Sequence, residues 1–342
     1  MYLPIADAVV NPIALVVIGF CVGILGGFFG VGGAFMVTPA LNIFGFPMAY
    51  AIGTDVAHIF GKSIVSTYKH ALLKHVDWKL GAVVGLLGMF GVNLGKDMVL
   101  YLEKVNLVGP IVRIVYMLLL FTIGGLMLME CLSKKAASSD RDEAGISRVA
   151  RRIRGLKIPP VLSFPQSGIE SVSIWAVVLL GVFTGFVSGF LGVGGGFVRV
   201  PMFIYLLGLP TVIAVGTDLL AILISNAWGA YIYATAGKVE LVGAAVMLLG
   251  AGVGAQLGSL ATAFIKGMQI RLYFAITVLL AGASVVLKQF GLDRVAGYLM
   301  LGSALALSAW ILILLVREVA AGKRRIEASA FGEAAAGKDS VE

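Results

Sequence analysis

The chain has 342 residues, of which 59% are hydrophobic and only 13% are charged, and its formal net charge at pH 7 is +8. Soluble domains carry about 25% charged residues, so this composition excludes a water-soluble globular protein. Apolar runs long enough to cross about 30 Å of hydrocarbon recur along the whole chain, and they are continuous rather than alternating. We therefore predict an all-α polytopic membrane protein that is embedded in, and contacts, the lipid bilayer.

The net charge and the two cysteines argue against several other classes of protein. The basic residues cluster beside apolar segments, so they indicate membrane topology rather than nucleic-acid binding. Cys21 and Cys131 lie in apolar sequence without Cys/His spacing around them, which predicts neither a disulfide nor a metal site, and no cofactor is indicated. The first residues lack the charged start and cleavage site of a signal peptide, so we expect the first apolar segment to be retained.

The first unit, residues 1–132, begins with an apolar region that a glycine cluster interrupts. The part after the glycines has only about ten apolar residues, too few to cross a membrane. We therefore predict a helical hairpin that enters the membrane and returns to the same side. The unit consists of this hairpin at 12–44 and of spanning helices at 48–71, 78–100 and 110–132.

A basic linker at residues 133–170 leads into a second unit, residues 171–290. This unit consists of a hairpin at 174–207 and of helices at 211–236, 240–263 and 271–287. One extra transmembrane helix is expected at 294–317, followed by a tail at 318–342.

The second unit repeats the sequence of the first. The stretch GGFFGVGGAFMVTP, which begins at Gly26, returns 162 residues later as SGFLGVGGGFVRVP, which begins at Ser188. The next helix carries the letters GTD in both copies, beginning at Gly53 and Gly216. Matches continue through the following helix, which indicates a duplicated unit of about four elements.

The basic residues predict the orientation of the two units. Lysines and arginines crowd the linker and follow the last helix, so both should be cytoplasmic in a multi-pass protein of the inner membrane. If each hairpin returns to its own side, the two units then lie upside down relative to each other. Inverted repeats with broken helices are typical of secondary transporters, whose substrate binds where the broken elements meet.

The duplicated glycine cluster, the proline after it and the GT pair resemble the TauE/SafE family of sulfite exporters. The resemblance implies an inner-membrane carrier of small anions, with sulfite, sulfonates and other organosulfur compounds as the usual substrates. It also implies that the hairpin glycines and GT threonines lie near the substrate: Gly30, Gly32, Gly33, Thr54, Gly192, Gly194, Gly195 and Thr217. Asp55 and Asp218 depart from the family pattern, because a small residue is expected after GT.

The glycine clusters suit an anion in physical terms as well. A hairpin tip without side chains leaves backbone N–H groups accessible, and the helix N-terminus that follows adds positive potential. The alternative is close helix packing, for which small residues are also common in membranes. Asn226 and Ser63 occupy matched positions that offer either uncharged hydrogen bonds or packing contacts.

Ionisable residues inside spanning segments indicate function, because each costs at least about 2.5 kcal/mol unless it has a partner or faces a cavity. Asp55, His58 and Lys62 share one helix face. We expect Lys62 to offset the charge of the anion, and Asp55, His58 or Asp218 to take a coupling proton; the alternative is a closed pair of Asp55 and Lys62 bridged by His58. Arg199 either reaches the anion or extends to the lipid headgroups.

These features predict a secondary transporter of a small anion that works by alternating access and is not an enzyme. An anion channel with the same glycine filter remains an alternative, and an integral-membrane enzyme is a weaker one. The sequence leaves open whether the protein forms a homodimer.

Overall fold

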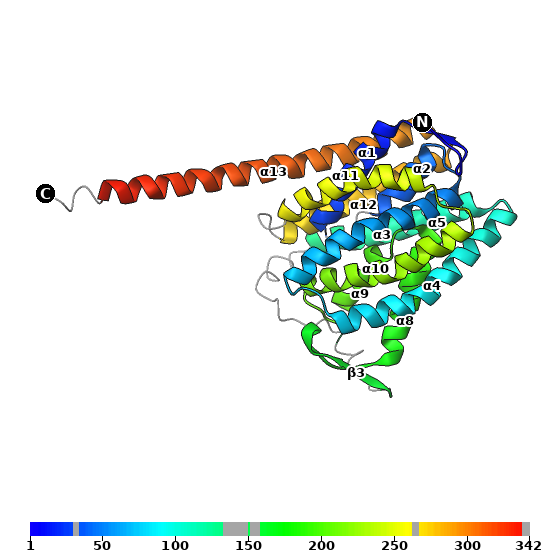
Figure 1. The fold of residues 1–342 in the computed structure, drawn as a ribbon, viewed down its shortest axis with the longest axis horizontal. Helices are drawn as coiled ribbons and strands as arrows, with labels where there is room; N and C mark the ends of the chain where they lie inside the picture. Colours follow the sequence, from blue (N-terminus) through cyan, green and yellow to red (C-terminus); the bar gives the residue numbers. More distant parts are fainter. Residues whose placement is uncertain (30–33, 133–149, 151–157, 262–266, 337–342) are drawn as a thin grey trace.

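The computed structural model describes residues 1–29, 34–132, 150, 158–261 and 267–336. Most of these residues are helical, and eight of the described helices are long and apolar enough to cross a membrane. The long helices lie side by side in one bundle, from which α13 (Asp293–Ala336) projects (Figure 1). The predicted all-α polytopic fold is therefore confirmed.

The first half begins with a strand pair that the sequence analysis did not predict. Strands β1 (Tyr2–Leu3) and β2 (Ala8–Val9) are antiparallel. The following elements are α1 (Pro12–Phe29), the 3-10 helix η1 (Ala34–Met36), α2 (Val37–Ile43), α3 (Met48–Leu72), α4 (Trp78–Lys104) and α5 (Val108–Leu132). Asp77 caps α4, because its carboxylate accepts the backbone N–H of Leu80 at 3.0 Å.

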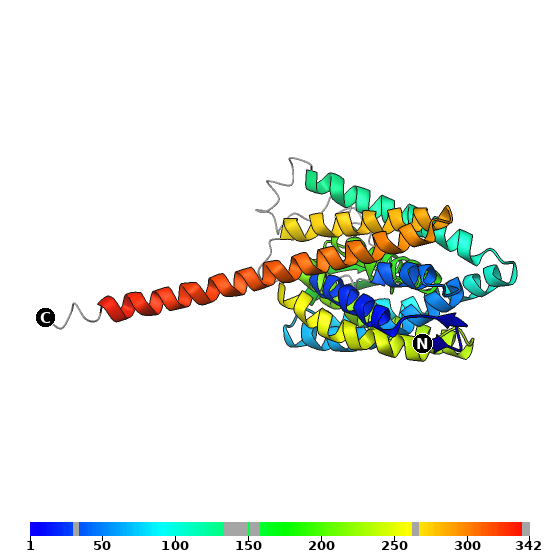
Figure 2. The same cartoon turned by 90° about the horizontal axis from the view of Figure 1, so that it is seen from above.

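The second half follows the same order of elements. Strands β3 (Val161–Phe164) and β4 (Ile169–Ser173), with η2 (Pro165–Ser167) between them, come first. The helices that follow are α8 (Ile174–Leu191), α9 (Gly196–Tyr205), α10 (Thr211–Thr235), α11 (Leu241–Ala261) and α12 (Gly267–Gln289), and α13 is the last. Figure 2 places α5 and α12 together on one side of the bundle and α11 on the opposite side.

The end of the basic linker is structured where the sequence suggested only a connection. The antiparallel β3 and β4 pair Val161 with Ser173, and Phe164 and Ile169 are fully buried. Both side chains pack with apolar residues of α4, α8 and α9. The hairpin therefore covers one end of these helices.

The second glycine cluster makes the turn between α8 and α9. Gly192, Gly194 and Gly195 have φ angles of +80°, +71° and +77°, a conformation that glycine adopts without steric cost. Gly192 ends α8, where its N–H donates to the carbonyl of Ser188 at 2.8 Å. Helix α9 has ten residues, so the chain leaves the turn through an element too short to span a membrane.

The closest helix contacts join one repeat to the other. Helix α1 packs against α11, and α8 packs against α4. A Cβ atom built on Gly23 would lie 2.8 Å from the Cα of Ala251, and one built on Gly185 would lie 2.7 Å from the Cα of Gly88. Positions 23 and 88 of the first copy correspond to 185 and 251 of the second, so the same contact occurs twice with the copies exchanged.

The order of these contacts gives the helix directions. Gly19, Gly23 and Gly27 of α1 approach successively later residues of α11, so these helices run parallel. Glycines of α4 approach α8 and α10 in the same ascending order. Helix α3 runs parallel to α11, because Gly53 and Gly61 approach Lys238 and Leu248 in turn. It runs antiparallel to α10, because Val56 lies near Gly229 and Ile59 packs with Ile222. Helices α1 and α8 therefore run in opposite directions.

Candidate functional site

The two glycine-broken segments meet inside the bundle. Phe35 of η1 and Phe197 of α9 occupy equivalent positions of the repeat, and their ring centroids are 5.3 Å apart. A residue contacts its own equivalent only close to the axis that relates two copies. The second glycine turn also lies against the first half, because a Cβ on Gly192 would be 2.6 Å from Thr38 Oγ1. The predicted glycines Gly30, Gly32 and Gly33 lie outside the described residues.

The GT threonines contact the backbone of the opposite half. Thr217 Oγ1 accepts the N–H of Asp77 at 3.0 Å, directly before α4. Thr54 Oγ1 accepts the N–H of Glu240 at 3.0 Å, directly before α11. All of these groups are buried. Each threonine therefore joins its own helix to the start of a helix in the other repeat, and its predicted contact with substrate stays a prediction.

Asp55 is held by the short helix of its own half. The backbone N–H and the hydroxyl of Thr38 donate to Asp55 Oδ2 at 3.0 and 2.8 Å. His58 Nδ1 lies 3.5 Å from Asp55 Oδ1, and both side chains are fully buried. Lys62 is 5% exposed on the same helix, so the predicted face of ionisable side chains lies inside the protein.

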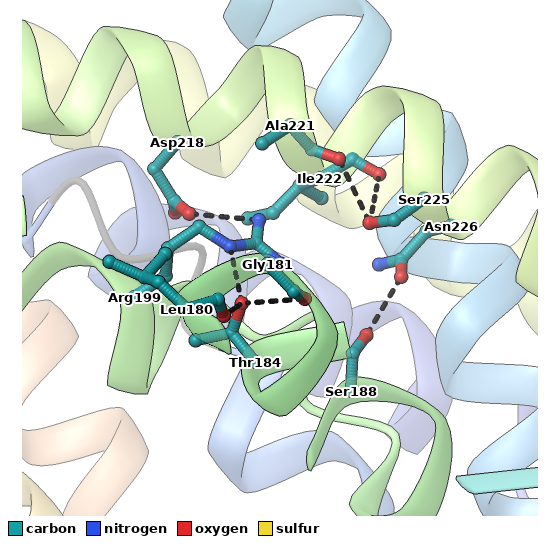
Figure 3. A network of polar contacts seen from close by, with 10 residues as sticks. All are labelled: Leu180, Gly181, Thr184, Ser188, Arg199, Asp218, Ala221, Ile222, Ser225 and Asn226. Atoms are coloured by element: carbon teal, nitrogen blue, oxygen red, sulfur yellow. Dashed lines mark hydrogen bonds and ion pairs between the residues drawn. The ribbon is translucent and has the colours of Figure 1, made fainter. Parts of the chain in front are cut away.

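Arg199 is fully buried, which excludes the alternative that it extends to the lipid headgroups. Its Nε donates to Thr184 Oγ1 at 3.0 Å, and its Nη1 donates to Asp218 Oδ1 at 3.1 Å (Figure 3). Because Asp218 is also fully buried, each charge depends on the other for compensation. The pair ties the first turn of α9 to α10.

Several buried polar atoms at this centre have no hydrogen-bond partner among the described residues. They are Asp55 Oδ1, both ring nitrogens of His58, Arg199 Nη2, Asp218 Oδ2 and Asn226 Nδ2. A folded protein leaves few such atoms, because each costs about 1–3 kcal/mol or more. Other buried atoms without a partner in the described part of the chain belong to Thr67, His70, His75, Trp228 and Glu240. The six atoms at this centre are candidates for contact with a ligand or a proton, because five of them belong to ionisable side chains.

The two halves carry different side chains at matched positions of the repeat. The second copy carries Ala221 and Ser225 where the first has His58 and Lys62. The first copy carries Val37 where the second has Arg199. The two copies therefore contribute different charges to the site.

A small pocket of about 10 Å³ lies between α2, α3, α5 and α12. Its lining includes Thr38, the residue that binds Asp55, together with Tyr116, Arg113 and Lys288. The Tyr116 hydroxyl donates to the carbonyl of Leu191 at 2.8 Å, which ties α5 to the end of α8. This pocket could not be predicted from the sequence, because its residues come from distant segments without a shared motif.

The fold and its buried polar centre define a multi-pass helical membrane protein with ionisable groups in its interior. Residues 15–285 match the family model described as "Sulfite exporter TauE/SafE". This match covers well over half of the chain, so the protein belongs to the TauE/SafE family.

Similar proteins carry names of membrane transporters. A "Probable membrane transporter protein" of Methanocaldococcus jannaschii is 30% identical over 55% of this chain and 60% of its own length. A protein of the same name from Xylella fastidiosa strain 9a5c is 28% identical, over 60% of this chain and 66% of its own. The "Probable membrane transporter protein YunE" of Bacillus subtilis is 27% identical over 80% of this chain and 97% of its own. The chain thus spans less than two thirds of the first two relatives, and no solved structure matches it.

Proposed function

We propose that the protein is a secondary transporter that moves a small anion across the bacterial inner membrane by alternating access. Sulfite, a sulfonate or another sulfur oxyanion is the substrate that we favour. Membership of the TauE/SafE family and the transporter names of the relatives support membrane transport. The same findings favour a transporter over an enzyme.

The observation that carries this proposal is the buried arginine at the glycine turn. Arg199 lies in the first turn of α9, is fully buried, and has one donor atom, Nη2, without a partner among the described residues. An intramembrane cation is costly unless function or pairing compensates for it. A charged donor beside an N-terminal helix turn suits a negatively charged ligand.

Alternating access fits the way in which the halves are joined. Helices α1 and α8 run in opposite directions, and each packs on a helix of the other repeat. Two inverted units with equivalent contacts can exchange their conformations, which opens the shared centre first to one side and then to the other. We place the linker and the C-terminus on the cytoplasmic side, because their basic residues favour it.

Charge balance suggests how transport is coupled. With both carboxylates ionised, Asp55 and Asp218 already offset Lys62 and Arg199, so Lys62 can offset the charge of a bound monoanion only after a proton has been taken up. Uptake of a proton by His58 or by one of the two carboxyl groups would restore neutrality in this poorly solvated interior. Without a coupled proton, an inside-negative potential would favour export of a monoanion by about 2.3 kcal/mol per 100 mV.

Uptake into proteoliposomes tests the proposal. Purified protein should take up radiolabelled sulfite with saturable kinetics, and unlabelled sulfonates should compete more strongly than chloride. A chain that conducts current far above carrier turnover would be an anion channel. Conversion of the sulfur compound into a product would indicate an enzyme, and either result would refute the carrier.

A further inference from the structure

We infer that the second half alone holds the oxygens of the anion, between Arg199 Nη2 and Asn226 Nδ2 at the turn formed by Gly194 and Gly195. This inference rests on the proposed function and deepens it, because it names the donor atoms and adds Asn226 and Ser188 to the binding site.

Both donors are buried without a partner. The Arg199 and Asn226 side chains have no exposed surface, and neither Arg199 Nη2 nor Asn226 Nδ2 has a hydrogen-bond partner among the described residues. A buried donor that bonds nothing destabilises the fold. Two such donors at one turn are explained if a ligand accepts their hydrogen bonds.

Both donors also border the glycines of the turn. A Cβ on Gly194 would lie 3.1 Å from Asn226 Nδ2, and a Cβ on Gly195 would lie 2.7 Å from Arg199 Nη2. Each donor therefore packs directly against a glycine of the turn, and a side chain at either glycine would collide with the donor and displace it.

The remaining contacts of these side chains orient the two donors. The Ser188 hydroxyl donates to Asn226 Oδ1 at 2.9 Å, and this bond turns the amide nitrogen toward the side of the network where Arg199 lies (Figure 3). Thr184 and Asp218 occupy the other donor atoms of Arg199. Ser188 is thus a positioning residue, and Asn226 is a direct ligand.

Donors from two separate side chains suit an anion that presents several oxygens. An SO₃ group can accept one hydrogen bond from each donor through different oxygens, whereas a halide offers a single centre. The N-terminal amides of α9 add positive potential to the same place. Two separate donors therefore suit an oxyanion.

The first half lacks this arrangement. Gly26, Val37 and Ser63 stand at the positions that correspond to Ser188, Arg199 and Asn226. The Ser63 hydroxyl donates to the carbonyl of Phe60 on its own helix, at 2.8 Å. One oxyanion per chain is therefore expected at this site.

Equilibrium binding of sulfite to the purified full-length protein tests the inference. Asn226→Ala removes the donor, and Asn226→Asp keeps the size and the acceptor for Ser188 but adds a negative charge. Each should weaken sulfite binding by about tenfold or more, since a hydrogen bond to a charged ligand is lost. Ser188→Ala should weaken binding by a smaller factor. In transport, these variants should raise KM more than they lower kcat.

Ser225→Ala is the matched control, because Ser225 is next to Asn226 in the chain and its hydroxyl, within the described part of the protein, bonds only the carbonyls of Ala221 and Ile222 on its own helix. Its sulfite affinity should equal that of the wild type. Wild-type sulfite affinity in both Asn226 variants would overturn the inference, and so would a loss of affinity in Ser225→Ala as large as theirs. In either case the proposed function would stand if the wild-type protein transports sulfite. If Asn226→Ala does not fold, the sulfite affinities of Ser188→Ala and Asn226→Asp test the inference in its place. A wild-type protein that neither binds nor transports sulfite or a sulfonate would overturn both proposals.

Discussion

The ion pair of Arg199 and Asp218 allows structural and functional roles of a buried charge to be separated. Arg199→Met replaces the guanidinium by an apolar chain of similar length. It leaves the fully buried Asp218 carboxylate without its cation and removes the hydrogen bonds to Asp218 Oδ1 and Thr184. Breaking a buried pair at one partner costs about 3–5 kcal/mol of stability.

The double variant Arg199→Met, Asp218→Asn removes the uncompensated charge as well. Replacing both partners of a buried pair is often nearly neutral, so we expect most of the lost stability to return. Transport should not return, because the cation that binds the anion is still missing. The single and double variants would therefore have different stabilities and the same low flux.

Two measurements on the same preparations check this prediction. Thermal unfolding in detergent reports stability, and sulfite uptake into proteoliposomes reports function. Recovery of uptake together with stability in the double variant would refute the reasoning that Arg199 binds substrate. An unfolding temperature unchanged in Arg199→Met would instead refute the buried ion pair.

Three further predictions concern other parts of the centre. Lys62→Ala should abolish most sulfite uptake although the protein still inserts into membranes, and wild-type flux would refute its role in offsetting the charge of the anion. Thr54→Val and Thr217→Val should each lower the free energy of unfolding by about 1–3 kcal/mol, because a buried N–H loses its acceptor; unchanged unfolding would contradict this, and a raised KM would support their predicted contact with substrate. Gly254→Ala should prevent recovery of monodisperse protein on size-exclusion chromatography, because its Cβ would overlap α1, whereas Gly252→Ala should behave as wild type, because no described residue lies within 4 Å of its Cβ.

The sequence was sufficient to predict the fold class and the family. Helix length and apolarity are local properties, so spans such as Thr211–Thr235 follow from the sequence. The duplicated glycine clusters and GT pairs carried the family resemblance, which the match over residues 15–285 confirms. The placement of a short helix after the second cluster also follows from local sequence, because ten residues cannot span a bilayer.

Contacts between distant segments could not be predicted in this way. The partners of Thr217 and Thr54 lie 140 and 186 residues away, and no local pattern encodes them. The depth of Arg199 depends on how α9 packs against α10, so the sequence left two alternatives open. The β3 and β4 pair was not predicted, because its short apolar stretches follow a highly charged linker.

The partners of Asn226 illustrate the same limit. Its match with Ser63 was visible in the repeat, but hydrogen bonding and packing remained equally good explanations. Only the bond from Ser188 and the approach of Asn226 Nδ2 to Gly194 indicate a direction for its amide.

Counterflow of sulfite is the most direct test of the carrier mechanism. Proteoliposomes loaded with unlabelled sulfite and diluted into a trace of radiolabelled sulfite should accumulate the label transiently, because a carrier that alternates between two sides exchanges substrate across the membrane. The same protein with Arg199→Met should show no accumulation. Label that only equilibrates, at a rate independent of the internal sulfite, would contradict alternating access around this buried centre.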